Sequence, residues 1–541
     1  MENDNPTTIT RSAGVIGFAV MVSRLLGLMR EQAIAYFFTA GVSADAFYAA
    51  FRIPNLVRDL FGEGVLSKAF VRTFTATELE DGEEAAQRLA SRVFNLTALV
   101  LTVLCLIGIF AATPIVNLMT GGEGFDSQLN SEQEFGLTDK RSLTVYLTRI
   151  MFPFLILVSF AAIAMGLLNS KGKFGVPACA SSFFNLGSLI VGVWGYYVSR
   201  ELGLHPATGL AVGVLIGGAL QFLVQVPSMW RVGFRYRPSI SFRDPRMRQV
   251  VRLIIPAVVG AAALQINLFV NLRFASQGEG WITYLTRAFR LMHLPIGVFG
   301  VAISTAALPN LSKLVVQDRL ADYRQSFSYS LRLIILFTLP ASVGLMVLSE
   351  PICRLIFEWG KATHFDTLQT AWALVFYAFG LCGFSAVKIA TDGFYAFNNT
   401  RTPVIVSAFT VLANIVLNYV LIFRLGLDHR AIACSTSCTT TLNFLVLLIL
   451  LHRKVGSLEL RNVGILLVKV LVSSIIMGTI CSGMHSWIEG WMGVDGVIAR
   501  LTGVLVPIIV GVVTFFGSCR LLSVKDLGSL LNALPRRGNP S

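Results

Sequence analysis

The chain has 541 residues, of which 54% are hydrophobic and only 14% are charged, and its mean hydropathy is +0.69. So apolar a composition at this length excludes a soluble globular protein and predicts a polytopic membrane protein. The formal net charge of +14 then reflects loops that orient the protein and contact anionic lipids, and it does not indicate nucleic-acid binding.

Apolar runs long enough to cross a bilayer recur along the whole chain. A hydrocarbon core about 30 Å thick needs ~20 apolar residues per helix. The polar segment before the first run carries Glu2 and Asp4 and has no basic n-region, so we expect the first helix to be retained and not cleaved as a signal peptide. We predict an all-α fold with about fourteen transmembrane helices, at residues 15–38, 47–74, 93–116, 145–168, 179–197, 209–229, 253–274, 281–311, 331–348, 368–389, 404–423, 432–451, 463–485 and 501–521.

Most basic residues fall in every second loop. Lys171, Lys313 and Arg453 lie on the same predicted side as the heaviest cluster, which stands between the sixth and seventh helices. The positive-inside rule places this side in the cytoplasm and predicts that both termini are cytoplasmic. The arginines of the cluster are Arg231, Arg235, Arg237, Arg243, Arg246, Arg248 and Arg252.

No common catalytic motif is visible in the sequence. It contains no P-loop, no GxSxG and no HExxH, so nothing supports ATP hydrolysis or the common hydrolase chemistries. The eight cysteines lie mostly in apolar runs and lack the paired spacing of a metal or redox site. We therefore predict a transporter and not an enzyme, with no metal and no cofactor, whose driving force comes from outside the chain.

Arginines inside the first two predicted helices are the strongest functional signal, because ionisable residues in membrane spans tend to face a cavity or a partner. Arg24 and Arg30 lie six residues apart, within ~120° of each other on a helical wheel. Arg58 follows in the second helix, with Asp59 and Glu63 as predicted partners.

Prolines accompany these arginines in both halves of the chain. Pro54 predicts a bend in the second helix, and Pro295 predicts a break in the eighth, shortly after Arg290. This recurrence indicates two halves related by duplication. Guanidinium groups that converge in a cavity without matching carboxylates predict an anionic ligand, and a diphosphate suits their planar, bidentate geometry. Near helix ends, snorkelling or interhelical pairing is an equally good interpretation for Arg52, Arg273, Arg287 and Arg424.

Several of these motifs together resemble a known transporter family. They are Ser23-Arg24 through Arg30, Asp45-Ala46-Phe47 through Pro54-Asn55-Leu56 and Arg58, Phe289-Arg290-Leu291, and Gly300-Val301 through Leu308-Pro309. Over nearly its whole length the chain is similar to the lipid II flippase family, the MurJ or MviN group of the multidrug/oligosaccharidyl-lipid/polysaccharide exporter superfamily. The resemblance implies two pseudo-symmetric six-helix lobes in a V shape, residues 1–230 and 231–453, followed by two additional transmembrane helices and a cytoplasmic tail in 454–541.

The same resemblance implies the cargo and the site. The cargo is lipid II, an undecaprenyl-diphosphate-linked disaccharide-pentapeptide, which moves from the cytoplasmic to the periplasmic leaflet of the bacterial inner membrane by alternating access. Phe289 and His293 stand where several relatives have acidic residues, which leaves the counter-ion of Arg290 open. The implied headgroup-binding residues are Arg24, Arg30, Arg58, Arg290, Asp45 and Asn55.

The sequence indicates the energy source and the partners less directly than it indicates the cargo. An inside-negative membrane potential is a sufficient drive, because moving one charge through 100 mV is worth about 2.3 kcal/mol. A monovalent cation is a further option, for which Asn414 and Asn418, one helical turn apart, are the candidate site; packing amides are the alternative interpretation. Expected partners are membrane lipids and other cell-wall synthesis proteins.

Two other functions stay open. One is the export of another lipid-linked oligosaccharide, which would use the same diphosphate chemistry. The other is a membrane-embedded glycosyltransferase, which would need catalytic acids in an outward loop; the richest such loop, 121–141, shows no paired-acid motif.

Overall fold

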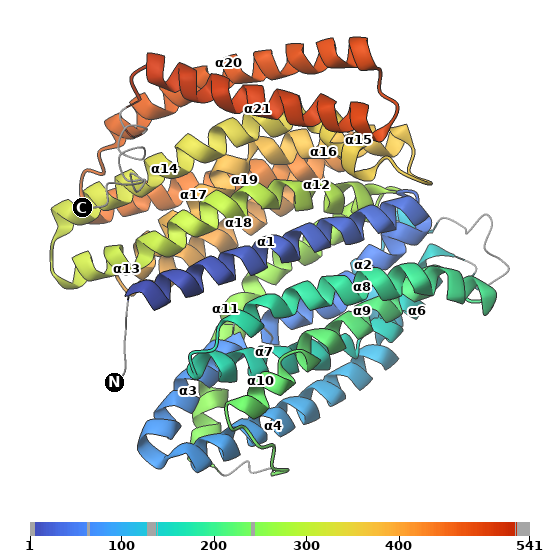
Figure 1. Cartoon of the computed structure of the whole chain (residues 1–541), viewed down its shortest axis with the longest axis vertical. Helices are drawn as coiled ribbons and strands as arrows, with labels where there is room; N and C mark the ends of the chain where they lie inside the picture. The colour runs from blue at the N-terminus through green and yellow to red at the C-terminus, as the bar shows by residue number, and fades with distance from the viewer. Residues whose placement is uncertain are drawn as a thin grey trace, which may run out of the picture. The chain divides into compact units, whose positions relative to one another are not determined.

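The structure is a computed structural model that describes residues 6–61, 65–126, 137, 139–239, 244–524 and 526. All regular elements in this part of the chain are helices (Figure 1). They form two compact units, Met1–Thr283 and Tyr284–Ser541. The prediction of an all-α polytopic protein is confirmed.

The first unit is built from long helices joined by short connections. Helix α11 packs against α2 and α3 and so belongs to this unit. The sequence-based division into lobes at residue 230 stays a prediction. The helices are α1 (Pro6–Phe37), α2 (Val42–Phe61), α3 (Val65–Asp81), α4 (Glu83–Phe110), α5 (Ala112–Met119), the 3-10 turn η1 (Glu123–Phe125), α6 (Lys140–Met151), α7 (Phe154–Ser170), α8 (Gly175–Glu201), α9 (Ala207–Leu223), α10 (Val226–Arg231) and α11 (Pro245–Ala275).

The second unit continues from α12, which begins in the first. Its last two helices run side by side (Figure 1) and pack on α14 through a core that includes Leu336, Leu466 and Met477. The elements are α12 (Trp281–Pro295), the π-helix η3 (Ile296–Val301), α13 (Ala302–Val316), α14 (Leu320–Val347), α15 (Ser349–Phe357), α16 (His364–Phe379), α17 (Leu381–Tyr395), α18 (Arg401–Tyr419), the π-helix η4 (Val420–Arg424), α19 (His429–Val455), α20 (Leu460–Met492) and α21 (Val497–Leu521).

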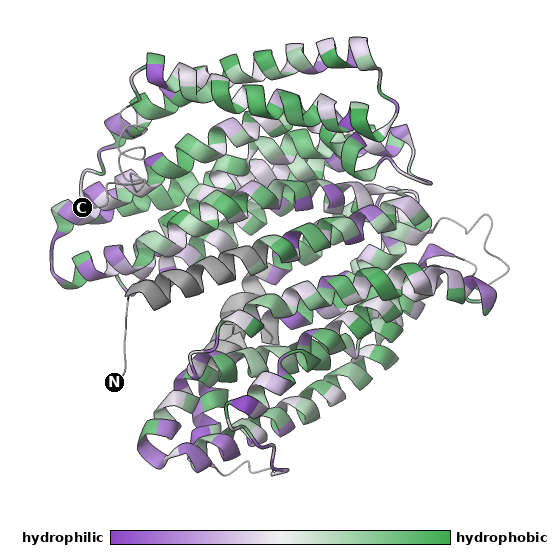
Figure 2. Cartoon of the chain, viewed as in Figure 1, coloured by the Kyte–Doolittle hydropathy of each residue, from purple (hydrophilic) through white to green (hydrophobic). Residues whose placement is uncertain are grey.

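Membrane-length helices dominate both units. Among the described residues ten helices are long and apolar enough to cross a membrane, and the pair α16 and α17, bent by 41°, brings the number to eleven. Figure 2 shows apolar residues along the helices and hydrophilic residues gathered toward their ends. The other three predicted spans also coincide with helices, namely α1, α2 followed by α3, and α11. The expected total of about fourteen is therefore an approximate count.

The two prolines singled out in the sequence have different effects. Helix α2 continues through Pro54 without interruption, and residues 62–64, where the neighbouring glycines stand, lie outside the described part. In the second unit α12 ends at Pro295 and the π-helix η3 follows directly. Because proline has no backbone N–H, it interrupts the i→i−4 ladder there. The eighth span therefore stays one continuous helix, Trp281–Val316, whose hydrogen-bond pattern widens after Pro295 where a break was expected. π-turns of this kind often stand at functional sites.

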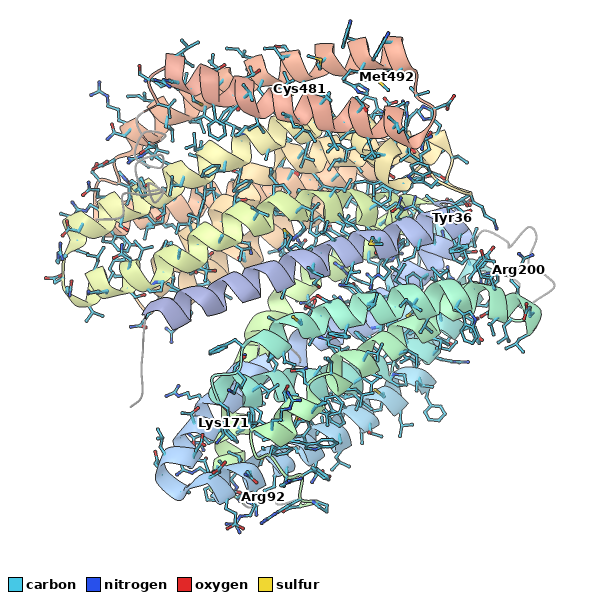
Figure 3. The ribbon with its side chains drawn as sticks, viewed as in Figure 1. Tyr36, Arg92, Lys171, Arg200, Cys481 and Met492 are labelled. Carbon is cyan, nitrogen blue, oxygen red and sulfur yellow. The ribbon has the colours of Figure 1, made fainter. Side chains whose placement is uncertain are left out.

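The acidic stretch 78–84 forms an ion-pair network at one end of the first unit. Figure 3 shows Arg92 and Lys171 toward this end and Tyr36 and Arg200 toward the other. A hydrogen bond from Arg237 holds the pKa of Glu84 below its usual value. The network therefore holds the segment that follows α10 against the ends of α3 and α4. Its pairs are Lys171 with Glu78 and Glu83, Arg237 with Glu84, and Arg246 with Glu80 and Asp81.

Helices α8 and α9 touch backbone to backbone. A Cβ built on Gly209 of α9 would lie 2.1 Å from the carbonyl carbon of Gly195 in α8. No side chain fits at that distance, so small residues are required for this approach, as is common between membrane helices.

We expect Gly209→Ala to destabilise the protein by roughly 1–3 kcal/mol, as overpacking usually does. Gly464→Ala in α20 is the matched control, because nothing lies within 4 Å of a Cβ there and alanine favours a helix. The measurement is thermal unfolding of both purified variants in detergent. A Gly209→Ala variant that melts at or above the wild-type temperature would contradict this packing.

Candidate functional site

Arg30 on α1 is the most enclosed of the predicted substrate arginines, with 8% of its surface exposed. Its guanidinium carbon lies 5.5 Å from the ring centre of Phe184 and 5.9 Å from that of Phe51, which gives two cation–π contacts. Its Nη2 is 3.3 Å from Oε1 of Glu31. The buried Glu31 also accepts a 2.5 Å hydrogen bond from the hydroxyl of Tyr48. Arg30 thus has a counter-charge next to it in sequence, a pairing that sequence reasoning missed.

Arg24 lies where α1 packs against α8. Nδ2 of Asn185 donates to the carbonyl of Ser23 at 3.0 Å and to its hydroxyl at 3.2 Å. Gly27 faces the same amide, since a Cβ there would be 3.6 Å from Oδ1 of Asn185. Arg24 itself is half-buried. These contacts set the rotation of α1 between Arg24 and Arg30.

Helix α2 carries Asn55 and Arg58 three residues apart, and therefore on one face. Arg58 donates from Nε at 3.1 Å and from Nη2 at 2.7 Å to Oδ1 of Asp59, one of its predicted partners; Glu63 lies outside the described residues. The side-chain oxygen of Asn55 is buried and accepts no hydrogen bond from the described residues. The pairing of Arg58 with Asp59 is confirmed, whereas the expectation of a guanidinium without a matching carboxylate is corrected for Arg30.

Asp45, at the start of α2, is completely buried, and four donors surround its carboxylate. They are Nζ of Lys140 at 2.8 Å, the backbone N–H of Gly280 at 2.7 Å, and the N–H and hydroxyl of Thr283 at 2.9 and 2.6 Å. The carboxylate thus meets the N-terminus of α12, where free N–H groups and the helix dipole favour negative charge. Lys140 is also fully buried, with its Nζ 4.3 Å from the ring centre of Phe125. This arrangement favours a positioning role for Asp45 over direct contact with a headgroup.

Arg290 lies on α12 in the second unit and is half-buried. The ring of Phe289 stands 4.3 Å from that of His293 and 5.3 Å from that of Tyr377, between centres. Phe289 and His293, which left the counter-ion of Arg290 open, are therefore part of an aromatic cluster. The other three predicted arginines lie in the first unit.

Arg287, one turn before Arg290, is completely buried. Its Nε and Nη2 have no hydrogen-bond partner within the described residues, and its guanidinium carbon lies 5.5 Å from the ring centre of Phe357. The interpretation that Arg287 snorkels to an interface is therefore wrong, and no salt bridge of Arg287 occurs among the described residues. The burial of Arg287 could not be predicted from its position near a predicted helix end.

The candidate ion site forms a buried network of amides and hydroxyls between α18 and α19. Nδ2 of Asn414 lies 3.3 Å from the hydroxyls of both Ser435 and Thr439, and Nδ2 of Asn418 donates to Oδ1 of Asn414 at 3.0 Å. The hydroxyl of Ser435 donates to Oδ1 of Asn418. No carboxylate takes part in these bonds. No group of three or more His, Cys, Asp or Glu side chains suited to a metal occurs in the described part of the chain.

Known proteins similar to this chain identify its family. A family model described as lipid II flippase MurJ matches residues 34–500. The chain is 32% identical over 526 residues to the probable lipid II flippase MurJ of Vibrio cholerae serotype O1, covering 96% of this chain and 97% of that protein. It is 33% identical over 445 residues to the lipid II flippase MurJ of Burkholderia cenocepacia, covering 81% and 83%. The chain belongs to the lipid II flippase MurJ family.

Solved structures agree with this assignment. A lipid II flippase MurJ in an inward closed conformation matches this MurJ-family chain with a TM-score of 0.74 at 27% identity, covering 95% of this chain and 99% of that one. An inward-facing multidrug resistance MATE family transporter of the MOP superfamily matches with a TM-score of 0.67 at 14% identity, covering 83% and 99%, which shows a shared fold. Family membership and ten or more membrane-length helices make the chain a multi-pass inner-membrane protein.

Because Asp45 is buried and Asp126 is exposed, replacing Lys140 should destabilise the protein much more than replacing its neighbour Arg141. Lys140→Met leaves Asp45 buried among neutral donors, and removing one partner of a buried pair costs about 3–5 kcal/mol. Arg141→Met removes a pair with Asp126, whose side chain is 68% exposed, at a cost of about 0–1 kcal/mol. Thermal unfolding in detergent compares the two variants, and equal melting temperatures would argue against the buried pair.

Proposed function

We propose that this chain moves lipid II from the cytoplasmic to the periplasmic leaflet of the inner membrane by alternating access. The observation that carries the proposal is its similarity, over nearly the full length, to proteins named lipid II flippase MurJ. A protein of this family is a transporter and not an enzyme, so the cycle consists of binding, rocking and release.

The diphosphate of the headgroup binds to Arg24, Arg30, Arg58 and Arg290 in this proposal. Arginine suits it because the planar guanidinium makes two parallel, charge-assisted hydrogen bonds. The rings of Phe51 and Phe184 hold the guanidinium of Arg30 in place, so little conformational freedom is lost when an anion binds.

The existing counter-charges are weak enough to be exchanged for substrate. Charge-assisted N–H···O bonds are usually about 2.7–2.9 Å long, whereas Arg30 and Glu31 are separated by 3.3 Å. Arg58 and Asp59 make a shorter contact of 2.7 Å, but their side chains are 25% and 30% exposed, and pairs that reach solvent contribute little. A doubly charged headgroup competes favourably with both carboxylates.

Asn55 and Asp45 have different roles in this scheme. The buried oxygen of Asn55 can accept a hydrogen bond from an O–H or N–H group of the sugar or peptide. Asp45 acts through Lys140 and the first turn of α12, and so positions the helix that carries Arg290.

Membrane potential drives the cycle in this proposal. We place both termini in the cytoplasm, which is supported by the loop arginines and by the Lys171 network at one end of the first unit. An inside-negative potential then favours outward movement of the anionic headgroup and return of the empty cationic site, at about 2.3 kcal/mol per charge and 100 mV. A monovalent cation at Asn414 and Asn418 is a secondary proposal, supported by the side-chain oxygens gathered there. Contact with other cell-wall synthesis proteins stays a prediction.

We expect Arg24→Ala and Arg290→Ala to abolish movement of lipid II to the outer face in cells depleted of their own flippase, with lipid II accumulating on the inner face. The physical reason is that alanine removes the guanidinium that pairs with the diphosphate. The measurement is the amount of lipid II accessible from outside, at equal membrane expression of each variant.

Arg401→Ala is the control, because Arg401 is an exposed residue at the first turn of α18. It should transport as wild type. Full transport by both Arg24→Ala and Arg290→Ala would refute the headgroup site, and failure of the wild type to move lipid II, while it moves another lipid-linked oligosaccharide, would refute the cargo.

A drive by membrane potential can be tested separately from the headgroup site. Dissipating the membrane potential with valinomycin and potassium should slow lipid II movement in vesicles, whereas replacing sodium with choline at constant potential should not. The reason is that the diphosphate carries the charge that the potential acts on. If transport responds to sodium and is lost in Asn418→Ala, the cation at Asn414 and Asn418 replaces potential as the drive.

A further inference from the structure

An open apolar groove lies on the second unit between α18 and α19. Its volume is about 490 Å³. Helix α18 contributes apolar side chains spaced by one helical turn, and α19 contributes the facing wall. The residues that define it are Leu412, Ala413, Val416 and Val420 on one side and Cys438 and Leu442 on the other.

Both helices that form the groove are of membrane-spanning length and composition. Leu412 and Val416 are 59% and 62% exposed within the described part of the chain. The hydroxyl of Thr439, which also lines the groove, donates to the carbonyl of Ser435 at 2.7 Å. The walls therefore present hydrocarbon to the bilayer and direct their hydroxyl back into the helix, which suits an alkyl chain and not a polar ligand.

A basic residue stands at one end of this groove. Positions 412, 416, 420 and 424 are spaced by four, so Arg424 continues the face that lines the groove, through the π-helix η4. Arg424 is exposed, and no ion pair with it occurs among the described residues. Arg430, at the start of α19, differs because Asp428 pairs with it at 2.8 Å.

Aromatic residues mark the same end. The rings of Tyr419 and Phe423 lie 5.4 Å apart on the last turns of α18 and η4, and both side chains are about half exposed, at 49% and 50%. Aromatic rings of this kind sit at the level of lipid headgroups. The groove therefore runs from this interface into the apolar layer, with the cation where a lipid phosphate lies.

We propose that the groove binds an acyl chain of an anionic phospholipid whose phosphate pairs with Arg424. The assignment combines an apolar groove open to the membrane, a guanidinium at its headgroup end and a neighbouring arginine already neutralised by Asp428. It does not depend on which cargo the transporter moves. A bound chain also covers Thr439, to which Asn414 donates at 3.3 Å, and so shields the buried amide network from water.

The test is native mass spectrometry of the full chain in detergent with added phosphatidylglycerol or phosphatidylethanolamine. We expect wild type to retain phosphatidylglycerol preferentially. Arg424→Gln should lower the retained phosphatidylglycerol about fivefold, the effect of one basic residue at an anionic membrane surface, and leave phosphatidylethanolamine unchanged. Ala413→Phe should lower retention of both lipids, because the ring fills the groove.

Two controls on α18 match these changes. Arg401→Gln removes a basic residue at the opposite end of the helix, and Val404→Phe adds a ring at a residue that does not line the groove; both should retain lipid as wild type. Melting temperatures check that each variant is folded. Unchanged lipid retention in folded Arg424→Gln, or an equal loss in Arg401→Gln, would overturn the proposal.

Labelling of Cys438 tests directly whether the lipid lies in the groove, because Cys438 is an exposed free thiol that lines it. Its labelling by N-ethylmaleimide, followed on the peptide, should slow when phosphatidylglycerol is added to wild type but not when it is added to Arg424→Gln. A lipid-free dimer in which Cys438 is already protected would assign the groove to a second copy of the chain and would also overturn the lipid site.

Discussion

The four hydrogen bonds to the carboxylate of Asp45 connect helices that carry residues of the proposed headgroup site. Lys140, Gly280 and Thr283 supply the donors, so the start of α2, the start of α6 and the N-terminus of α12 meet at one buried charge. A charge without such partners is expensive inside a membrane protein. The pair is therefore tolerated only when these segments are correctly placed, and α2 and α12 carry Arg58 and Arg290.

The arginines discussed above differ in how their guanidinium groups are paired. Arg58 has a short contact with its carboxylate neighbour, and Arg30 has a longer one supplemented by two aromatic rings. Arg287 lies against an aromatic face, and its Nε and Nη2 donate no hydrogen bond to a described residue. Carboxylates that pair weakly with arginines stabilise an empty site. An anionic ligand can still replace them. Full neutralisation by strong pairs would remove the reason for an anion to bind.

Irregular helices stand near two of the places in the second unit where we propose that a ligand binds. The π-helix η3 follows Pro295, less than two turns after Arg290, and η4 forms the end of α18 where Arg424 emerges. In η3 the cause is the missing N–H of proline. Such widened turns change which side chains face the same direction, and at η4 they set how the groove between α18 and α19 meets the headgroup region.

The amino-acid sequence by itself determined the fold class, the approximate positions of the spans and the residues that mark the family, because the hydropathy of a span depends only on residues that follow one another in the chain. It did not reveal that Glu31 lies against Arg30, that Lys140 neutralises Asp45, or that Arg287 is buried. Lys140 is 95 residues from Asp45, and no periodic pattern connects such positions. Only the packing of the helices decides which charges meet, since electrostatic partners in a membrane protein are selected by distance in space.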